Sequence, residues 1–352
     1  MTDLFASLAL PRGPALANRF ALAPLTNKQS HIDGTLSDDE YRWLTMRAEG
    51  GFALTITCAA HVQAGGKAFE GQLGIFSDAH LPGLSRLAGA IKAAGSVAAV
   101  QLHHGGMRTL TDPVAPSDEP GTGAHGLTLA EVEQVRDDFI AAARRAEAAG
   151  FDGVEIHGAH GYLLCEFLSP TINRRDDHYG GNIENRRRIL DEIVTGIRAT
   201  CGPDFQIGLR LSPERFGQVL AESIAVAGHF LAGGQLDYLD LSLWDVRKEP
   251  VEEGFRGRTL LSCFTGLPRG RTAIAVAGAV RDALEARWCL DNGADFVMVG
   301  KGAIVTHDLP RRLETNIGYS PPAMPVSAEH LAAEGLSPGF ISYMRTFKGF
   351  VV

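Results

Sequence analysis

The alternation of short apolar runs with longer helical segments is the feature of this sequence that most restricts its fold. Such runs recur eight times, and helix-like segments separate most of them. Strands joined through helices pair in parallel with right-handed crossovers, and eight of them imply closure into a barrel. The sequence therefore predicts a (β/α)8 TIM barrel of the α/β class, with a doubly wound open sheet as the alternative. The predicted strands are 20–23, 52–60, 97–102, 152–156, 206–211, 236–241, 272–276 and 294–299.

Signals at the helix ends support this division. Gly95 follows one predicted helix and offers the left-handed conformation that helix ends favour. Thr128 and Glu131 are spaced as a capping box at the start of another helix. The predicted helices are 37–49, 81–94, 129–149, 183–199, 218–232, a short one within 258–266, and 281–292.

Two segments lie outside the repeat. The Gly- and Pro-rich loop 103–128 after the third strand has the length of a lid or substrate loop. The segment 310–352 shows no strand pattern, yet its aromatic residues make it too apolar for a solvated linker. We expect a single domain, residues 1–352, in which 310–352 is a C-terminal extension that packs on the barrel or on a neighbouring subunit.

Charge and cysteine content exclude several classes of function. The 33 basic and 41 acidic residues give a net charge of −8 without a basic block, so no nucleic-acid or membrane partner is expected. Five scattered cysteines without a C-x-x-C pair argue against a disulfide framework and a cysteine-ligated metal. The N-terminus does not resemble a signal peptide, and no run reaches the ~18 apolar residues of a membrane span. The expected location is the cytoplasm.

Polar residues at the ends of the predicted strands mark the expected active site, because barrel enzymes keep their chemistry at that face. His157, His160 and Tyr162 follow the fourth strand within six positions. The other strand ends contribute Pro24, Leu25, Thr26, Cys58, Gln101, Arg210, Ala277, Gly278, Gly300 and Lys301.

Some of these residue types indicate a ligand by themselves. Gly278, Gly300 and Lys301 suit a phosphate site after the last two strands, although they are equally read as turn glycines and a solvated lysine. Arg210 ends an apolar run and needs an anionic or electron-rich partner. With Gln101 it suits the polar edge of a heteroaromatic ring; the alternative is that Arg210 pairs with Glu155 inside the barrel.

Several motifs resemble the old yellow enzyme family of FMN-dependent ene-reductases, and together they cover nearly the whole chain. The most specific is GFDGVEIHGAHGYLLCEFLSPTINRRDDHYGGNIENRRR at 150–188. The others, in the right order, are APLTN at 23–27, GIFSDAHLPGL at 74–84, QLHHGG at 101–106, IGLRLSPE at 207–214 and GADFVMVGK at 293–301.

The resemblance implies FMN as cofactor, NADH or NADPH as co-substrate, and a small-molecule activated alkene as substrate. It also implies a role for each matching residue, as follows: Pro24, Leu25 and Thr26 against the flavin ring, with Thr26 on its C4 carbonyl; Cys58 over the ring; Gln101 and Arg210 at the pyrimidine edge; Ala277, Gly278, Gly300 and Lys301 at the phosphate loops; His157 and His160 on the substrate's carbonyl oxygen; and Tyr162 as proton donor.

The chain departs from the family pattern at three of these positions. Lys301 stands where many relatives have arginine, Thr26 replaces the cysteine of one branch, and Cys58 is larger than the usual residue. The cysteine-rich second half of the iron–sulfur dienoyl-CoA reductases is absent, so a cluster-dependent enzyme is not expected.

The same residues allow three other functions. His103, His104, His157 and His160 would be the ligands of a metal-dependent hydrolase, but no convincing carboxylates accompany them and no metal is expected. Lys301 would be the nucleophile of a Schiff-base enzyme. A flavin-binding protein without turnover is the third alternative. His103 and His104 are also read as braces of the Gly105-Gly106 turn, Trp43, Phe69 and Trp244 as candidate pocket residues, and a homo-oligomer as an allowed assembly.

Overall fold

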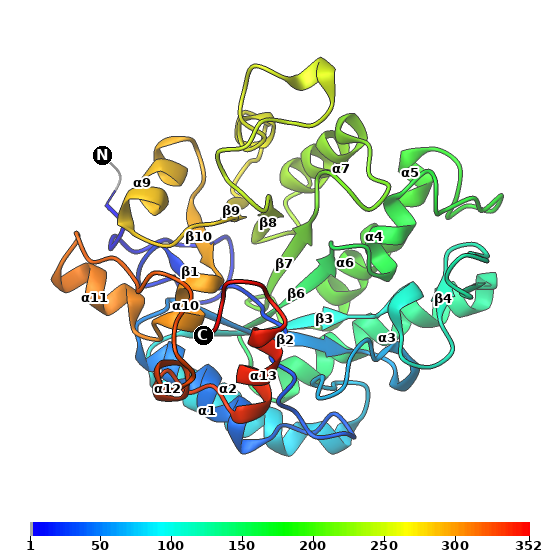
Figure 1. Cartoon of the computed structure of the whole chain (residues 1–352). Coiled ribbons are helices and arrows are strands. Elements are labelled where there is room, and N and C mark those ends of the chain that lie inside the picture. The colour runs from blue at the N-terminus through cyan, green and yellow to red at the C-terminus, as the bar shows by residue number, and fades with distance from the viewer. Residues whose placement is uncertain (1–2) are drawn as a thin grey trace.

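The barrel is formed by eight parallel strands. A computed structural model describes residues 3–352, and its strands close in the order β1-β10-β9-β8-β7-β6-β3-β2, as Figure 1 shows. The predicted (β/α)8 barrel is therefore confirmed, and the open-sheet alternative is wrong. The strands are β1 (Phe20–Leu22), β2 (Leu54–His61), β3 (Val97–His103), β6 (Gly153–Gly158), β7 (Gln206–Leu211), β8 (Tyr238–Ser242), β9 (Ala273–Ala277) and β10 (Phe296–Val299).

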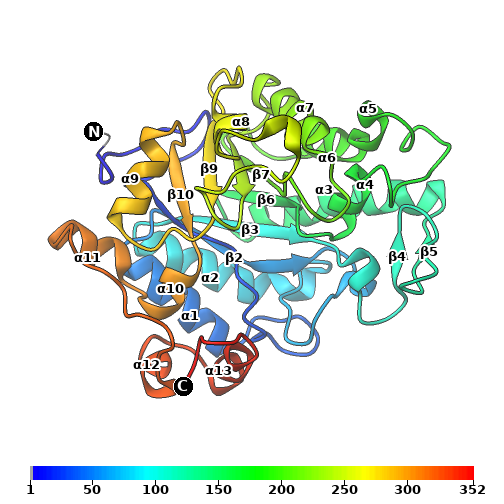
Figure 2. The ribbon, with the colours of Figure 1, turned by 45° about the horizontal axis from the view of Figure 1, so that its top comes forward.

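Helices cover the outside of the barrel, as the turned view in Figure 2 makes visible. The helix predicted over 183–199 is divided into α5 and α6 near Arg187, and the seventh unit contains only the one-turn helix α8. The helices are α1 (Asp38–Glu49), α2 (Leu81–Ala93), α3 (Leu129–Ala148), α4 (Leu163–Leu168), α5 (Ile183–Arg186), α6 (Arg188–Thr200), α7 (Leu220–Ala232), α8 (Ser262–Thr265), α9 (Ala283–Asp291), α10 (Lys301–Val305), α11 (Leu309–Thr315), α12 (Ala328–Ala333) and α13 (Pro338–Arg345).

The long loop after β3 has structure of its own. It contains a 3₁₀ turn at Gly106–Arg108 and a small parallel pair, β4 (Val114–Ala115) with β5 (His125–Gly126). The capping box predicted for the following helix is confirmed: Thr128 N–H donates to Glu131 Oε2 at 2.8 Å, and Glu131 N–H donates to Thr128 Oγ1 at 3.3 Å. The C-terminal end of this loop is thereby fixed to α3.

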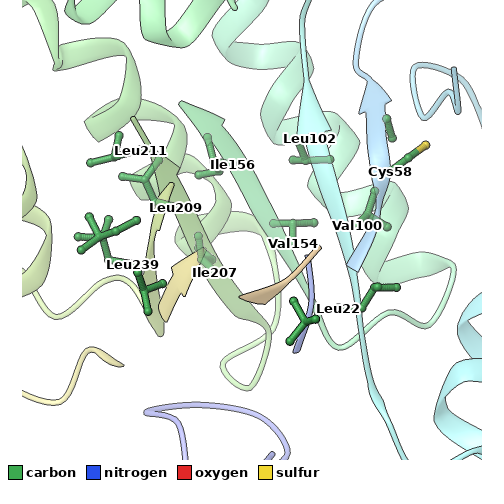
Figure 3. Close-up of a cluster of buried hydrophobic side chains, with 14 of the residues drawn as sticks. Leu22, Cys58, Val100, Leu102, Val154, Ile156, Ile207, Leu209, Leu211 and Leu239 are labelled. Carbon is green, nitrogen blue, oxygen red and sulfur yellow. The ribbon is translucent and has the colours of Figure 1, made fainter. Parts of the chain in front are cut away.

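Two apolar layers stabilise the barrel. The larger lies between the strands and the helices, where residues such as Val100, Ile156 and Leu209 are fully buried (Figure 3). The smaller fills the lower lumen with residues such as Ile56 and Met298. Each buried side chain of this size contributes about 1.5–3 kcal/mol. A rigid base therefore lies beneath the carboxyl ends of the strands.

The C-terminal extension lies against the barrel on the side of α1. Phe340 of α13 is fully buried, with its ring 5.6 Å from that of Trp43. Val326 and Val351 form a parallel bridge that joins the last residues to the segment before α12. In Figures 1 and 2 the red helices α12 and α13 accordingly lie beside α1. Contact of this extension with a neighbouring subunit stays a prediction. Among residues 3–352, no helix is both long and apolar enough to cross a membrane.

Candidate active site

A cavity of about 460 Å³ opens at the carboxyl ends of the barrel strands. Its walls come from strand ends, from the loops that follow them and from the C-terminal extension. Nine of the predicted site residues line it, and they come from five different strand ends. These are Pro24, Leu25, Thr26, Gln101, His157, His160 and Arg210, together with Tyr162 and Lys301 in the following segments.

The two histidines after β6 contact each other. His157 Nδ1 accepts a hydrogen bond from the N–H of Ala159 at 3.2 Å, and His157 Nε2 lies 3.3 Å from His160 Nδ1. The remaining ring nitrogen of His160, Nε2, lies 2.8 Å from Ser242 Oγ. His160 has a φ of +62°, and the strained turn that this implies directs its ring across the barrel toward β8.

Both imidazoles are neutral at physiological pH. Burial, followed by the neighbouring His160, lowers the pKa of His157 well below its usual value. Burial, followed by the positive charges of Arg210 and Arg108, lowers the pKa of His160 to about 3. Each ring therefore carries one N–H, and the position of that proton decides what the ring is able to bind.

Tyr162 lies beside this pair at the start of α4. Its ring centroid is 4.3 Å from that of His103 and 5.3 Å from that of His157, both nearly edge-on. The guanidinium of Arg108 lies over the same ring, 5.2 Å from its centroid. Tyr162 is half-buried and lines the cavity, so its phenol has access to a molecule bound there.

The two preceding histidines have structural partners. His104 Nδ1 accepts from the N–H of Gly106 at 3.1 Å, which confirms that it braces this turn. His103 Nδ1 lies 3.0 Å from Gln72 Nε2, and its ring supports Tyr162. In the part of the chain that the structure describes, no group of three or more His, Cys, Asp or Glu side chains is arranged to hold a metal ion.

A buried polar layer forms the floor of the cavity. Gln101 Nε2 donates to Glu155 Oε1 at 2.8 Å. Arg210 Nη1 lies 3.0 Å from Asp240 Oδ2, so the ion pair of Arg210 is with Asp240 rather than with Glu155. Burial and the nearby Asp240 raise the pKa of Glu155 to about 8, and burial also raises that of Asp240. With one arginine between two carboxyl groups, the layer holds a proton near neutral pH.

The expectation for Cys58 is wrong, because its thiol points away from the cavity. A bulge interrupts the pairing of β2 with β3 between Ile56 and Ala59, so the alternation of inward and outward side chains shifts by one residue. Cys58 consequently faces the outer apolar layer seen in Figure 3, and Ala59 lines the cavity instead.

A buried network outside the barrel accounts for the orientation of Cys58. Its Sγ donates to Glu40 Oε1 at 2.9 Å, and Glu40 also accepts from Asn27 Nδ2 at 3.0 Å and from Ser30 Oγ. Burial, and then the carboxyl of Glu40, raise the pKa of Cys58 well above its usual value. The network connects β2 to α1 and to the loop that carries Thr26, and it keeps this thiol protonated.

Three predicted phosphate-loop residues, Ala277, Gly278 and Gly300, are not among the residues that line the cavity. Ala277 is buried in the lumen. A Cβ on Gly278 would come within 3.0 Å of Asp245 N, so only glycine allows this close approach of the loop after β8. A Cβ on Gly300 would contact Leu25 at 3.6 Å. Lys301 follows directly, exposed and on the cavity wall.

The rim of the cavity contains residues that the sequence did not assign. Arg108 and Arg215 both lie over the ring of Phe216, at 5.6 and 5.9 Å, and Arg215 also lies 4.6 Å from the ring of Trp244. Trp244 and Phe69 line the cavity as anticipated, whereas Trp43 is buried beneath α13. The remaining lining residues are Ala59, Ile304, Tyr343, Met344, Phe347 and Phe350. The only sequence signal for the last four was the apolar spacing of the C-terminal extension.

A family model and several curated proteins are similar to this chain over most of its length. The family model described as "NADH:flavin oxidoreductase / NADH oxidase family" matches residues 3–319. The chain is 36% identical over 318 residues to the probable NADH-dependent flavin oxidoreductase YqiG of Bacillus subtilis, covering 86% of this chain and 85% of the relative. It is 32% identical to the NADH oxidase of Thermoanaerobacter brockii, of which it spans 48%.

A solved structure agrees over nearly the full length. The old yellow enzyme homologue from Zymomonas mobilis superposes with a TM-score of 0.81 at 28% identity, covering 97% of this chain and 99% of that protein. The similarity therefore includes the barrel, the long loop after β3 and the C-terminal extension.

Proposed function

Because the chain belongs to the NADH:flavin oxidoreductase / NADH oxidase family, FMN is its cofactor and NAD(P)H its reductant, and we propose that it is an ene-reductase. Its substrate is an activated alkene such as an enone, enal, maleimide or nitroalkene. The observation that carries the proposal is the convergence of two neutral imidazoles, His157 and His160, next to the phenol of Tyr162 in one cavity.

Unsatisfied polar atoms on the cavity floor fit the pyrimidine edge of FMN. Arg210 is buried, and its Nε and Nη1 have no well-aligned acceptor even though Asp240 balances the charge. Glu155 engages the amide nitrogen of Gln101, which leaves the amide oxygen of Gln101 free to accept. An edge with carbonyl acceptors and one N–H donor matches this set. Lys301 offers a cation for the phosphate, and Pro24, Leu25, Thr26 and Ala59 provide wall for the ring.

The residues around the cavity suit reduction of a polarised double bond. When bound and reduced, FMN supplies the hydride that reaches the β-carbon of the alkene. Negative charge then develops on the carbonyl oxygen of the substrate, and N–H donors from His157 and His160 stabilise it. One such donor is typically worth ~10²–10³ in rate. Tyr162 delivers the proton to the α-carbon, which completes addition of H₂ across the bond.

The competing readings have less support in the structure. The ammonium of Lys301 is exposed to solvent, whereas a Schiff-base lysine is activated in an apolar pocket. The four histidines are not arranged as the ligands of one metal ion. His103 and His104 form hydrogen bonds with Gln72 and Gly106, and Nε2 of His160 lies against Ser242 Oγ. A flavin-binding protein without turnover differs from the proposed enzyme only in rate.

Steady-state turnover of the purified yellow protein tests the proposal. NADH and NADPH are each supplied with a panel of enones, maleimides and nitroalkenes, and loss of the alkene is followed by chromatography. Reduction of at least one alkene above the rate of free reduced FMN supports the proposal. Oxidation of NAD(P)H by oxygen alone, with every alkene unchanged, would restrict the enzyme to an NAD(P)H oxidase.

We propose the cytoplasm as the location of this reaction. All five cysteines are free thiols, and four of them are buried, as expected of a protein in a reducing compartment. A homo-oligomer is also proposed, to be tested by sedimentation.

A further inference from the structure

Ser242, the last residue of β8, lies between the two halves of the site. Its Oγ is 2.8 Å from Nε2 of His160, and Nη2 of Arg210 donates to the same oxygen at 3.4 Å. The serine is buried, so water does not compete for these contacts. A single hydroxyl thus joins the arginine of the proposed flavin edge to a histidine of the proposed substrate site.

The chemistry of the two partners determines the direction of the hydroxyl. A guanidinium only donates hydrogen bonds, so Arg210 occupies a lone pair of Ser242 Oγ. The hydroxyl proton remains free, and Nε2 of His160 is the acceptor within reach. A neutral imidazole that accepts at Nε2 carries its own proton on Nδ1.

The tautomer of His157 is determined by a separate hydrogen bond. His157 Nδ1 accepts from the N–H of Ala159, so the proton of His157 is on Nε2. The two protonated nitrogens, His157 Nε2 and His160 Nδ1, are then the pair that lies 3.3 Å apart. Neither is able to accept from the other, and an oxygen atom placed against both satisfies the two donors together.

A second arrangement of protons competes with this one. If His160 carried its proton on Nε2, that N–H would donate to Ser242 and His157 would donate to Nδ1 of His160. The pair would then be satisfied internally and would present no second donor to a ligand. The direction of the Ser242 hydroxyl distinguishes the two arrangements.

We propose that Ser242 is a positioning residue: held by Arg210, it gives its hydroxyl proton to Nε2 of His160 and thereby selects the tautomer in which His160 and His157 both donate to one substrate oxygen. This assignment rests on the proposed function, since it concerns the oxygen site of the activated alkene. It makes the substrate-binding state of His160 depend on the residue that holds the flavin edge.

Nuclear magnetic resonance of the flavin-loaded protein tests the tautomer directly. With ring-¹⁵N-labelled histidine and 4-nitrophenolate as the oxyanion probe, wild-type His160 is expected to show a protonated Nδ1 and an unprotonated, hydrogen-bonded Nε2. In Ser242→Ala this preference is lost, and phenolate affinity falls about tenfold. Ser242→Thr retains the hydroxyl and is expected to restore both.

Ser212→Ala is the matched control. Ser212 Oγ accepts from the backbone N–H of His160 at 3.0 Å and does not contact the ring nitrogens. Its loss removes a hydroxyl that is equally close in space, and the tautomer of His160 should not change.

Results that contradict the role of Ser242 differ from results that contradict the proposed function. A wild-type complex with the proton of His160 on Nε2 overturns the assignment, and so does a Ser242→Ala protein that binds phenolate as tightly as wild type with the same tautomer. The wild-type spectrum alone decides the tautomer if Ser242→Ala does not fold. Failure of wild type to bind phenolate, or binding that leaves both histidine signals unchanged, contradicts the proposed function itself.

Discussion

The floor and the rim of the cavity are built in opposite ways. The floor consists of strand-end side chains that are buried and paired within the barrel, such as Gln101 with Glu155 and Arg210 with Asp240. The rim consists of loop and C-terminal residues, where exposed guanidiniums lie on aromatic rings, as Arg215 does on Trp244. Buried polar pairs fix geometry strongly, whereas exposed cation–aromatic contacts do so weakly. We infer that the floor sets the chemistry and the rim selects among substrates.

Replacement of Tyr162 is expected to give the largest effect. Tyr162→Phe keeps the ring that packs on His103 but removes the proton donor. Reduction of an enone should slow by ~10²–10⁴-fold, the typical contribution of a general acid. Stopped-flow measurement of flavin reduction by NAD(P)H should show little change. Equal slowing of both half-reactions would contradict the assigned role.

Two phenylalanines of the C-terminal extension, Phe340 and Phe347, are expected to have different roles: the first holds the extension on the barrel and the second contacts the substrate. Phe340 is fully buried against Trp43, whereas Phe347 lines the cavity and is 45% exposed. Phe340→Ala should lower the free energy of unfolding by about 3–5 kcal/mol. Phe347→Ala should leave it nearly unchanged and alter KM for bulky alkenes. Both free energies are measured by urea denaturation. Similar losses of stability in the two variants would contradict the claim that Phe340 stabilises the fold whereas Phe347 acts on the substrate.

Loss of a histidine on the floor should reduce oxyanion stabilisation. His157→Ala removes one of the two N–H donors, and kcat for enone reduction should fall by ~10²–10³-fold. Binding of 4-nitrophenol, followed by its absorbance, should weaken in parallel while FMN remains bound. Unchanged affinity would remove His157 from the oxygen site.

The raised pKa of Glu155 in the floor should make the stability of the protein depend on pH. The folded pKa of Glu155, about 8, lies above its usual 4.5, so the folded state binds more protons between these values. Stability contributed by this group is fully present below pH 4.5 and is lost as pH rises through 8, with a slope of up to about 1.4 kcal/mol per pH unit. Glu155→Gln should flatten this slope in thermal melts. The same slope in the variant would show that Glu155 is not the group that holds the proton.

Rim arginines should give the smallest effects. Arg215 is exposed, and its guanidinium lies over the rings of Phe216 and Trp244, so Arg215→Ala should change stability by about 0.5–1 kcal/mol or less. KM for a negatively charged alkene should rise a few-fold, while KM for a neutral alkene stays constant. A large fall in kcat would place this arginine in the chemistry and not in selection.

Most of the floor follows from the sequence, whereas of the rim the sequence indicates only Phe69 and Trp244 as candidates, without placing them. Strand ends follow from local alternation and turn signals, so the sequence alone places Gln101, His157 and Arg210 on one face. Cys58 was misplaced because the bulge depends on how β2 pairs with β3, which no local pattern reveals. Ser242 lies 82 residues from His160 and meets it only across the closed barrel.

The rim was missed for a related physical reason. Its residues lie on loops and on α13, whose positions depend on packing over the whole fold. The apolar spacing of the C-terminal extension indicated that Phe340, Phe347 and Phe350 would be buried somewhere. It did not indicate that two of them face the cavity.

The bulge in β2 has a consequence for how this site changes in evolution and in engineering. Two residues of β2, Thr57 and Cys58, stand opposite the single residue Val100 of β3, and this leaves both Ile56 and Ala59 facing inward. Deletion of Thr57 would therefore restore the regular alternation and still leave Cys58 facing outward and Ala59 facing the cavity. The surface that a bound ring meets is thus expected to tolerate this change in strand length, and to change when the residue at position 59 changes.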